Sequence, residues 1–229
     1  MEIFILGEAN ESRPARRMIR PALEHAAFDL GINVSCQWRQ NGAIDLAEIR
    51  TAHGIFVAPG SPGEGYEKII EAIRLAREDG IPCLGTCGGF QRMIAEYALK
   101  ELSYERIEHE EVMPSANNPL FSELSCSLTG QRDKVFIAAN SLALSLYEKE
   151  SVEERFFCHY GLSGRHKERI QSKDLKVSAY DKNGEARIIE HTKHLFFFGT
   201  LFVPQVSSTR ENPHPVIAAF VEAAEAKAG

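Results

Sequence analysis

Short apolar runs alternate with amphipathic stretches along the first half of the chain. Residues 54–58 are continuously apolar, which is typical of a strand buried on both faces of a sheet. Apolar residues at helical spacing follow between residues 66 and 79, and Gly80 stands where that helix would end. This alternation predicts a parallel sheet covered by helices on both faces. The expected strands are 2–6, 33–38, 54–58 and 81–85, and the expected helices are 20–30, 66–79 and one that begins after residue 87.

The second half of the chain is richer in predicted strands. Asp181-Lys182-Asn183-Gly184 is a strong hairpin-turn sequence between two of them. A last helix is expected after the segment Pro213-His214-Pro215. No repeat, linker or low-complexity segment interrupts the chain, so we expect one domain over residues 1–229. The expected strands here are 134–139, 175–180, 186–191 and 195–202, and the last helix is 216–228.

The composition narrows the class of protein. Hydrophobic residues make up 44% of the chain, which is enough for a continuous core. The formal net charge is −6, with acidic and basic residues interspersed, so neither nucleic acid nor an anionic membrane is expected as a partner. The expected ligand is a small molecule. The first residues do not form a signal peptide and no apolar run approaches membrane-spanning length, so a cytoplasmic location is expected.

Cysteine usage gives a second expectation. The five cysteines are odd in number and show no Cys-x-x-Cys spacing, which argues against both a disulfide framework and a thiolate zinc site. We therefore expect mostly buried, reduced thiols, no metal and no cofactor. The cysteines are Cys36, Cys83, Cys87, Cys126 and Cys158.

One cysteine lies in a sequence that carries chemistry. In Gly85-Thr86-Cys87-Gly88-Gly89, a predicted strand turns sharply into a helix, as in a nucleophile elbow. Such a turn strains the central residue and exposes its side chain, and the helix amino terminus favours the thiolate. The alternative is that Cys87 is an apolar residue buried in a turn, but the strand before it and the helix after it favour the functional reading. Cys83, inside the strand, is expected in the core.

Backbone amides near this elbow predict an oxyanion hole. The amide of Gly88 follows the cysteine directly, and a second donor is expected from Gly60 and Ser61, at the end of the preceding strand. Two such donors beside a thiolate are typical of acyl-transfer chemistry.

A family resemblance rests on these same residues. Residues 54–99, which include Leu84-Gly85-Thr86-Cys87-Gly88-Gly89-Phe90-Gln91, resemble the glutaminase domain of CTP synthase, a class I glutamine amidotransferase. The closing segment, residues 197–205, resembles that family's last strand, and the match extends weakly over the whole chain. The resemblance implies a flavodoxin-like α/β fold, a three-layer sandwich with a mainly parallel central sheet.

The resemblance also implies roles for single residues. It makes Cys87 the nucleophile and Gln91 a substrate-binding residue. Glu111, or its neighbour Glu110, falls where the family places an acid that binds the ammonium of glutamine; the alternative is a solvated acid in a charged run. Tyr160 lies in residues 156–161, which resemble the family's Arg-His-Arg-Tyr-Glu segment.

The chain departs from the family at the residues that complete the catalytic triad. The family's last strand ends in Phe-His-Pro-Glu, whereas Val203 and Gln205 hold the histidine and glutamate places here. Valine carries no titratable group, so ordinary glutamine hydrolysis is expected to be crippled. His159 replaces the arginine that grips the substrate carboxylate, which weakens amino-acid recognition.

Other histidines are candidates for the missing base. His159 is the first candidate and His109 the second, because both fall in segments that the family folds over its pocket; the alternative for each is a hydrogen-bonded or surface histidine. The remaining five without motif context are expected to be scaffold or surface, namely His53, His166, His191, His194 and His214.

Three functions stay open on the sequence. The first is a cysteine-dependent enzyme in which Cys87 attacks a small, glutamine-like or other amide, with His159 or water moving protons. The second is a non-catalytic module that binds a metabolite or a partner in the pocket where the family binds glutamine, and that acts in pyrimidine metabolism. The third is thiol redox chemistry. No Walker-type loop is present, so any synthetase function would need a separate subunit, and the partner expected is that subunit or a second copy in a homodimer.

Overall fold

The computed structural model describes residues 1–63, 65–125 and 128–229. Strands of this part of the chain form a nine-stranded sheet in the order β2-β1-β3-β4-β11-β10-β9-β6-β7. Neighbours from β2 to β11 are parallel, and neighbours from β11 to β7 are antiparallel. The strands are β1 Glu2–Leu6, β2 Ser35–Arg39, β3 Gly54–Val57, β4 Cys83–Thr86, β6 Arg132–Ile137, β7 Ser151–Arg155, β9 Leu175–Tyr180, β10 Ala186–His191 and β11 Phe197–Thr200. A separate antiparallel pair joins β5 Phe121–Glu123 to β8 Tyr160–Leu162.

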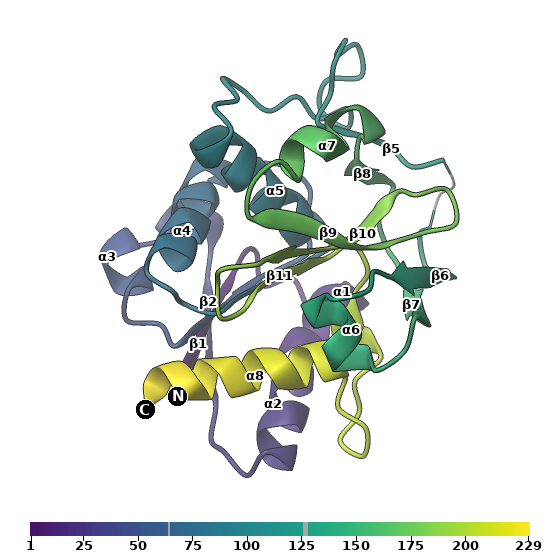
Figure 1. Cartoon of the computed structure of the whole chain (residues 1–229). Helices are drawn as coiled ribbons and strands as arrows, with labels where there is room; N and C mark the ends of the chain where they lie inside the picture. The colour runs from purple at the N-terminus through teal and green to yellow at the C-terminus, as the bar shows by residue number, and fades with distance from the viewer. Residues whose placement is uncertain (64, 126–127) are drawn as a thin grey trace.

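Helices cover both faces of the sheet (Figure 1). Helices α4 and α5 pack together on one face, and α2 and α8 pack together on the other. The predicted three-layer α/β sandwich is therefore confirmed, with a parallel centre and an antiparallel extension. The helices are α1 Pro14–Arg17, α2 Ile19–Asp29, α3 Leu46–Ile49, α4 Tyr66–Glu78, α5 Gly88–Glu101, α6 Leu142–Tyr147, α7 Lys167–Ile170 and α8 Pro215–Ala228, with 3-10 turns η1 Asn41–Ala43, η2 Gly164–His166 and η3 Pro204–Val206.

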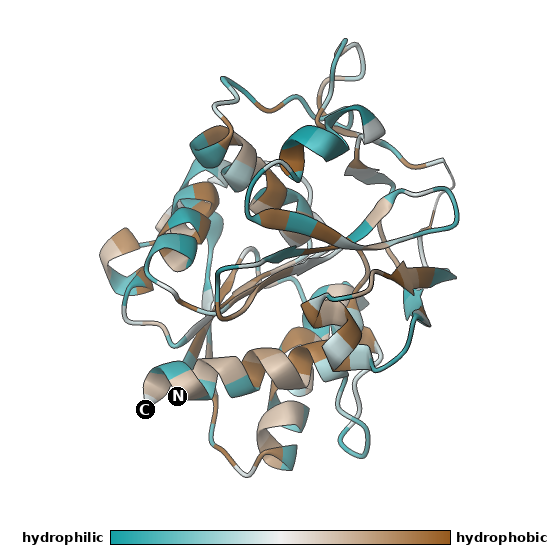
Figure 2. Cartoon of the chain, viewed as in Figure 1, coloured by the Kyte–Doolittle hydropathy of each residue, from teal (hydrophilic) through white to brown (hydrophobic). Residues whose placement is uncertain are grey.

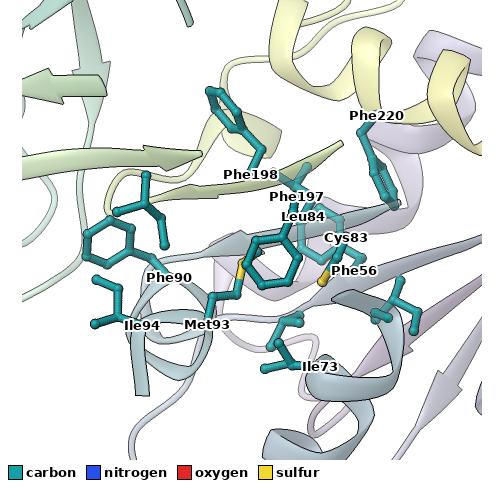
Figure 3. Close-up of a cluster of buried hydrophobic side chains, with 14 of the residues drawn as sticks. Phe56, Ile73, Cys83, Leu84, Phe90, Met93, Ile94, Phe197, Phe198 and Phe220 are labelled. Atoms are coloured by element: carbon teal, nitrogen blue, oxygen red, sulfur yellow. The ribbon is translucent and has the colours of Figure 1, made fainter. Parts of the chain in front are cut away.

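The core lies on both faces of the central strands. Hydrophobic residues concentrate along these strands and on the helix faces turned toward them (Figure 2). Cys83 and Leu84 of β4 are fully buried among Phe56, Met93 and other apolar side chains (Figure 3), which confirms the expected core location of Cys83. Burial of the Cys83 thiol raises its pKa, so this sulfur stays an unreactive thiol.

The hairpin predicted in the second half is present between β9 and β10. The Asp181 side chain accepts hydrogen bonds from the amides of Asn183 and Glu185, and Gly184 has a φ of 80°. Helix α8 starts after His214, whose side chain accepts from the amide of Val216. Within the described residues, no helix has both the length and the apolarity needed to cross a membrane.

The parallel strands place the candidate site. Strands β3, β4 and β11 are neighbours, so the segments that follow β3 and β4 meet at one edge of the sheet. Ligand sites of open α/β sheets lie beyond the carboxyl ends of such strands. Residues 58–63 and the turn at Cys87 therefore lie together.

Candidate active site

Cys87 is the turn residue between β4 and α5. Its backbone has φ 53° and ψ −110°, a conformation that an L-residue adopts at a cost of about 1–3 kcal/mol. Its amide donates to the carbonyl of Thr200 on β11 at 2.8 Å, so the neighbouring strand holds the turn in place. The elbow predicted from the glycine pattern has the strained backbone that exposes a nucleophile.

The loop after β3 lies directly against this elbow. A Cβ atom on Gly88 would lie 1.9 Å from the carbonyl oxygen of Gly60, and one on Gly89 would lie 2.1 Å from that of Val57. Glycine at both positions is what allows the close approach. The amides of Gly60, Ser61 and Gly88 donate to no described residue, and these three residues line the same cavity.

Two arginines hold this loop, and neither was expected from the sequence. Arg92 of α5 donates to the carbonyls of Ala58 at 3.1 Å and Ser61 at 2.9 Å, and Arg16 of α1 donates to that of Pro59 at 2.9 Å. Because guanidinium groups donate hydrogen bonds to these carbonyls, the loop is held in place. Arg92 is only 5% exposed, and burial lowers the pKa of its guanidinium. The partners of both arginines are backbone carbonyls, so the sequence carried no signal for these contacts.

The elbow and the loop border a cavity of about 490 Å³. It brings together most of the residues singled out in the sequence; Glu110 lies outside the lining, and its carboxylate accepts from the amide of Glu123. Residues that the sequence did not single out also contribute, among them Arg13, Arg16 and Thr129. The predicted site residues that line the cavity are Gly60, Ser61, Cys87, Gly88, Gln91, Glu111, His159 and Tyr160.

Polar contacts tie the cavity wall together. The Gln91 side chain donates to the carbonyl of Tyr160 at 2.8 Å, so helix α5 is joined to β8. The hydroxyl of Ser61 donates to the carboxylate of Glu111 at 2.6 Å, so one side chain of the oxyanion loop also fixes the acid expected to bind a ligand ammonium.

The two candidate bases lie in different surroundings. His109 is 4% exposed and outside the cavity lining; its Nδ1 accepts from the amide of Glu111 and its Nε2 donates to Gln91. Burial lowers the pKa of His109 to about 4, so it is neutral at pH 7. His159 is exposed at the cavity, and its Nε2 shares a hydrogen bond with the Thr129 hydroxyl at 2.8 Å. Of the two, His159 alone lines the space beside Cys87.

Comparison with known proteins identifies the family. The family model described as glutamine amidotransferase class-I matches residues 18–223. The chain belongs to the class-I glutamine amidotransferase family.

Several relatives of this chain within the family are CTP synthases. CTP synthases of Flavobacterium psychrophilum, Archaeoglobus fulgidus and Sulfolobus acidocaldarius are 32%, 31% and 28% identical to it over 98%, 97% and 99% of this chain. The chain spans less than half of their length, 44%, 44% and 45% respectively. A Trypanosoma brucei CTPS glutaminase domain with bound acivicin superposes with a TM-score of 0.90 at 20% identity, covering 99% of this chain and 94% of that one. That likeness establishes the fold of a CTP synthase glutaminase domain.

The residues at the places that the family resemblance assigns to the triad have other contacts here. Val203 is fully buried, lies outside the cavity lining, and contributes its amide to the carbonyl of Arg155. Gln205 is also fully buried; its amide nitrogen donates to the carbonyl of Ala15 at 2.7 Å and to the hydroxyl of Thr86 at 3.2 Å. Gln205 therefore supports Thr86, the residue that precedes Cys87.

A second sulfur contacts the sulfur of Cys87. Cys87 and Cys158 form a disulfide, with their Cα atoms 6.1 Å apart. The expectation of mostly reduced thiols was therefore wrong for this pair, because spacing along the chain does not reveal cysteines 71 residues apart that the fold brings together. Cys36 and Cys83 are free thiols, and Cys126 lies outside the described residues.

The histidines without motif context have structural contacts away from the cavity. His53 accepts from the amide of Glu2, His191 accepts from that of Lys193, and His194 bonds to the carbonyl of Ala76. His166 bonds to the hydroxyl of Tyr104, and His214 pairs with the buried carboxylate of Glu154. No group of three or more His, Cys, Asp or Glu side chains among the described residues is arranged to hold a metal ion.

Proposed function

We propose that this amidotransferase-like chain carries out cysteine-dependent chemistry on a small amide or related electrophile through Cys87. The observation that carries the proposal is the strained Cys87 backbone at the end of β4, with the amides of Gly60, Ser61 and Gly88 around one cavity. The thiolate would attack the carbonyl carbon, and the amides would donate to the oxygen that gains negative charge. Only the reduced form of Cys87 has a sulfur free for this step.

We further propose that ordinary glutamine hydrolysis is strongly reduced. Val203 cannot take the thiol proton or return one to departing ammonia, and such assistance is worth about 10²–10⁴ in rate. His159 is the proposed substitute, because it lines the cavity that contains Cys87. If it moves the proton, Cys87 should react slowly once that imidazole is removed.

The charges around the cavity suggest the ligand class. Glu111 brings a carboxylate to the cavity lining, and Arg13 and Arg16 bring guanidinium groups, of which that of Arg16 also pairs with Glu8. A small amide with both an ammonium and a carboxylate would find a partner for each charge. The arginines thereby compensate for the arginine that His159 replaces.

The test is covalent labelling of reduced protein. A panel of small amides, a glutamine-like diazoketone and acivicin, the ligand of the trypanosome domain, are incubated with wild type, Cys87→Ser and His159→Ala. We expect intact mass to show one adduct on wild type, none on Cys87→Ser, and slower labelling of His159→Ala. Comparing each amide with its analogue that lacks the α-carboxylate tests the part assigned to Arg13 and Arg16.

The second candidate is a binding module without catalysis. The replacement of both triad side chains, which the family resemblance implies at Val203 and Gln205, supports it, because the fold and the cavity would then be kept without the relay. Absence of any adduct on reduced, folded wild type, together with binding of a glutamine-like amide by calorimetry, would select this function. A homodimer or a separate synthetase subunit as partner, a role in pyrimidine metabolism, and one domain over residues 1–229 stay predictions.

A further inference from the structure

We propose that Cys87 and Cys158 are a redox-active pair that cycles between dithiol and disulfide, with a hydroperoxide as oxidant and a dithiol as reductant. This activity uses the same sulfur as the amide chemistry but does not depend on it.

The fold holds both cysteines at bonding range. Their Cα separation of 6.1 Å lies within the range of about 4.4–6.8 Å found for disulfides. Cys87 is fixed by its amide bond to Thr200. The segment around Cys158 is fixed on both sides, because Phe156 donates its amide to Gln131 and the carbonyl of Tyr160 accepts from the Gln91 side chain. The Cα atoms are therefore close enough for the two sulfurs to join.

The surroundings accept both redox states. The carbonyl of Leu201 lies 3.3 Å from the Cys158 sulfur, so in the dithiol form the Cys158 S–H has a hydrogen-bond acceptor. Cys87 lies at the amino terminus of α5, where the helix dipole favours a thiolate. Cys158 is only 4% exposed, whereas Cys87 is partly exposed. The geometry therefore assigns Cys87 the attack on the oxidant and Cys158 the resolving step.

The oxidation can be written with all atoms balanced. The Cys87 thiolate attacks one oxygen of the hydroperoxide, the O–O bond breaks, and the departing alkoxide takes a proton and leaves as an alcohol, with Cys87 now a sulfenic acid. The amides of Gly60, Ser61 and Gly88 are available to the departing oxygen. The Cys158 thiol then attacks the Cys87 sulfur, the S–O bond breaks, and water leaves as the disulfide forms.

Reduction returns the pair to its starting state. One thiolate of the dithiol attacks the disulfide and forms a mixed disulfide, and its second thiol then closes on the first. The reductant leaves as a disulfide, and both Cys87 and Cys158 are thiols again. A dithiol can reach the pair because the cavity of about 490 Å³ is bordered by both cysteines.

The experiment starts from reduced, desalted, full-length protein. It is treated with cumene hydroperoxide and followed by intact mass, with peptide mapping after alkylation of remaining thiols. We expect wild type to lose two hydrogen atoms, to consume one hydroperoxide per chain, to show a peptide that links Cys87 to Cys158, and to recover both thiols with dithiothreitol. Cys158→Ser should stop at a sulfenic acid that dimedone traps on Cys87. Cys36→Ser is the matched control and should behave as wild type.

Three outcomes would overturn the proposal. In the first, wild type keeps both thiols under excess hydroperoxide. In the second, the native protein keeps its disulfide in dithiothreitol. In the third, folded Cys158→Ser gives no dimedone adduct. If Cys158→Ser does not fold, the wild-type time course after dimedone addition provides the same information. Labelling by the diazoketone reports separately on the amide chemistry: it should be lost in oxidised wild type and return on reduction. Disulfide cycling without any labelling would refute the amide proposal alone, and labelling without cycling would refute the redox proposal alone.

Discussion

Gly88→Ala should uncouple Cys87 from its oxyanion loop. The added Cβ would lie 1.9 Å from the carbonyl oxygen of Gly60 and 2.8 Å from that residue's nitrogen and carbonyl carbon, whereas Cβ contacts below 3.0 Å essentially do not occur. The Gly60 peptide must therefore move by about 1.1 Å, the difference between 1.9 and 3.0 Å. A misplacement of about 1 Å costs on the order of 100-fold in rate, and losing one oxyanion donor costs about 10²–10³.

The assay for this variant is the rate of adduct formation. Reduced wild type and Gly88→Ala are incubated with excess glutamine-like diazoketone, and the labelled fraction is followed by intact mass. We expect Gly88→Ala to react about 100-fold more slowly, with circular dichroism of a folded protein. Gly63→Ala is the matched control, because a Cβ on Gly63 meets no atom of the described residues within 4 Å beyond its chain neighbours, and it should react as wild type. A folded Gly88→Ala that is labelled at the wild-type rate would refute the assignment of the Gly60, Ser61 and Gly88 amides to an oxyanion hole.

Three further predictions follow from buried groups. Burial lowers the pKa of His109 from 6.5 to about 4, so between these values the unfolded chain binds a proton that the folded chain does not. Acidification below pH 6.5 should therefore cost about 1.4 kcal/mol of stability per pH unit, and urea unfolding at pH 6.5 and at about pH 5 should show this loss in wild type but not in His109→Gln. Arg92→Met should slow diazoketone labelling about tenfold or more, because the carbonyls it holds are released. Its free energy of unfolding should change by less than about 2 kcal/mol, since burial of the guanidinium is itself unfavourable. Arg77→Met should lower the free energy of unfolding by about 3–5 kcal/mol, because it leaves the fully buried Glu96 carboxylate without its cation, and adding Glu96→Gln should restore most of the loss in thermal melting.

The sequence was informative where local pattern and burial agree. Strands β1, β9 and β10 begin and end at the residues expected, and β4 was placed within two residues. Apolar runs mark β1 and β4, which are covered on both faces, and the strong turn sequence at residues 181–184 marks where β9 ends and β10 begins. Strand β7, Ser-Val-Glu-Glu-Arg, was not predicted. It pairs at the sheet edge with only one neighbour, so its side chains are mostly polar and leave no apolar run.

The residues of the candidate site were also predicted or missed for physical reasons. Cys87, Gly88 and the loop at Gly60 could be predicted from the sequence. A strained turn and a close approach of two backbones both require glycines, and these glycines form a recognisable pattern around Cys87. The contact of Cys158 with Cys87 was not found, since it depends on a long-range pairing that no local spacing encodes. Arg16 and Arg92 were missed for a related reason: their partners are backbone carbonyls, which every residue carries and which therefore leave no mark in a sequence.

The bond from the Cys87 amide to the Thr200 carbonyl has a consequence for how this branch of the family can change. It is a main-chain contact between the turn after β4 and strand β11, so it is not made by the side chains at residues 203 and 205. The same stretch of polypeptide supports the Cys87 turn through its main chain and can supply a proton acceptor through its side chains. These two properties are independent of each other. A lineage can therefore exchange its acid–base partner, or dispense with it, without first rebuilding the frame that presents the reactive atom.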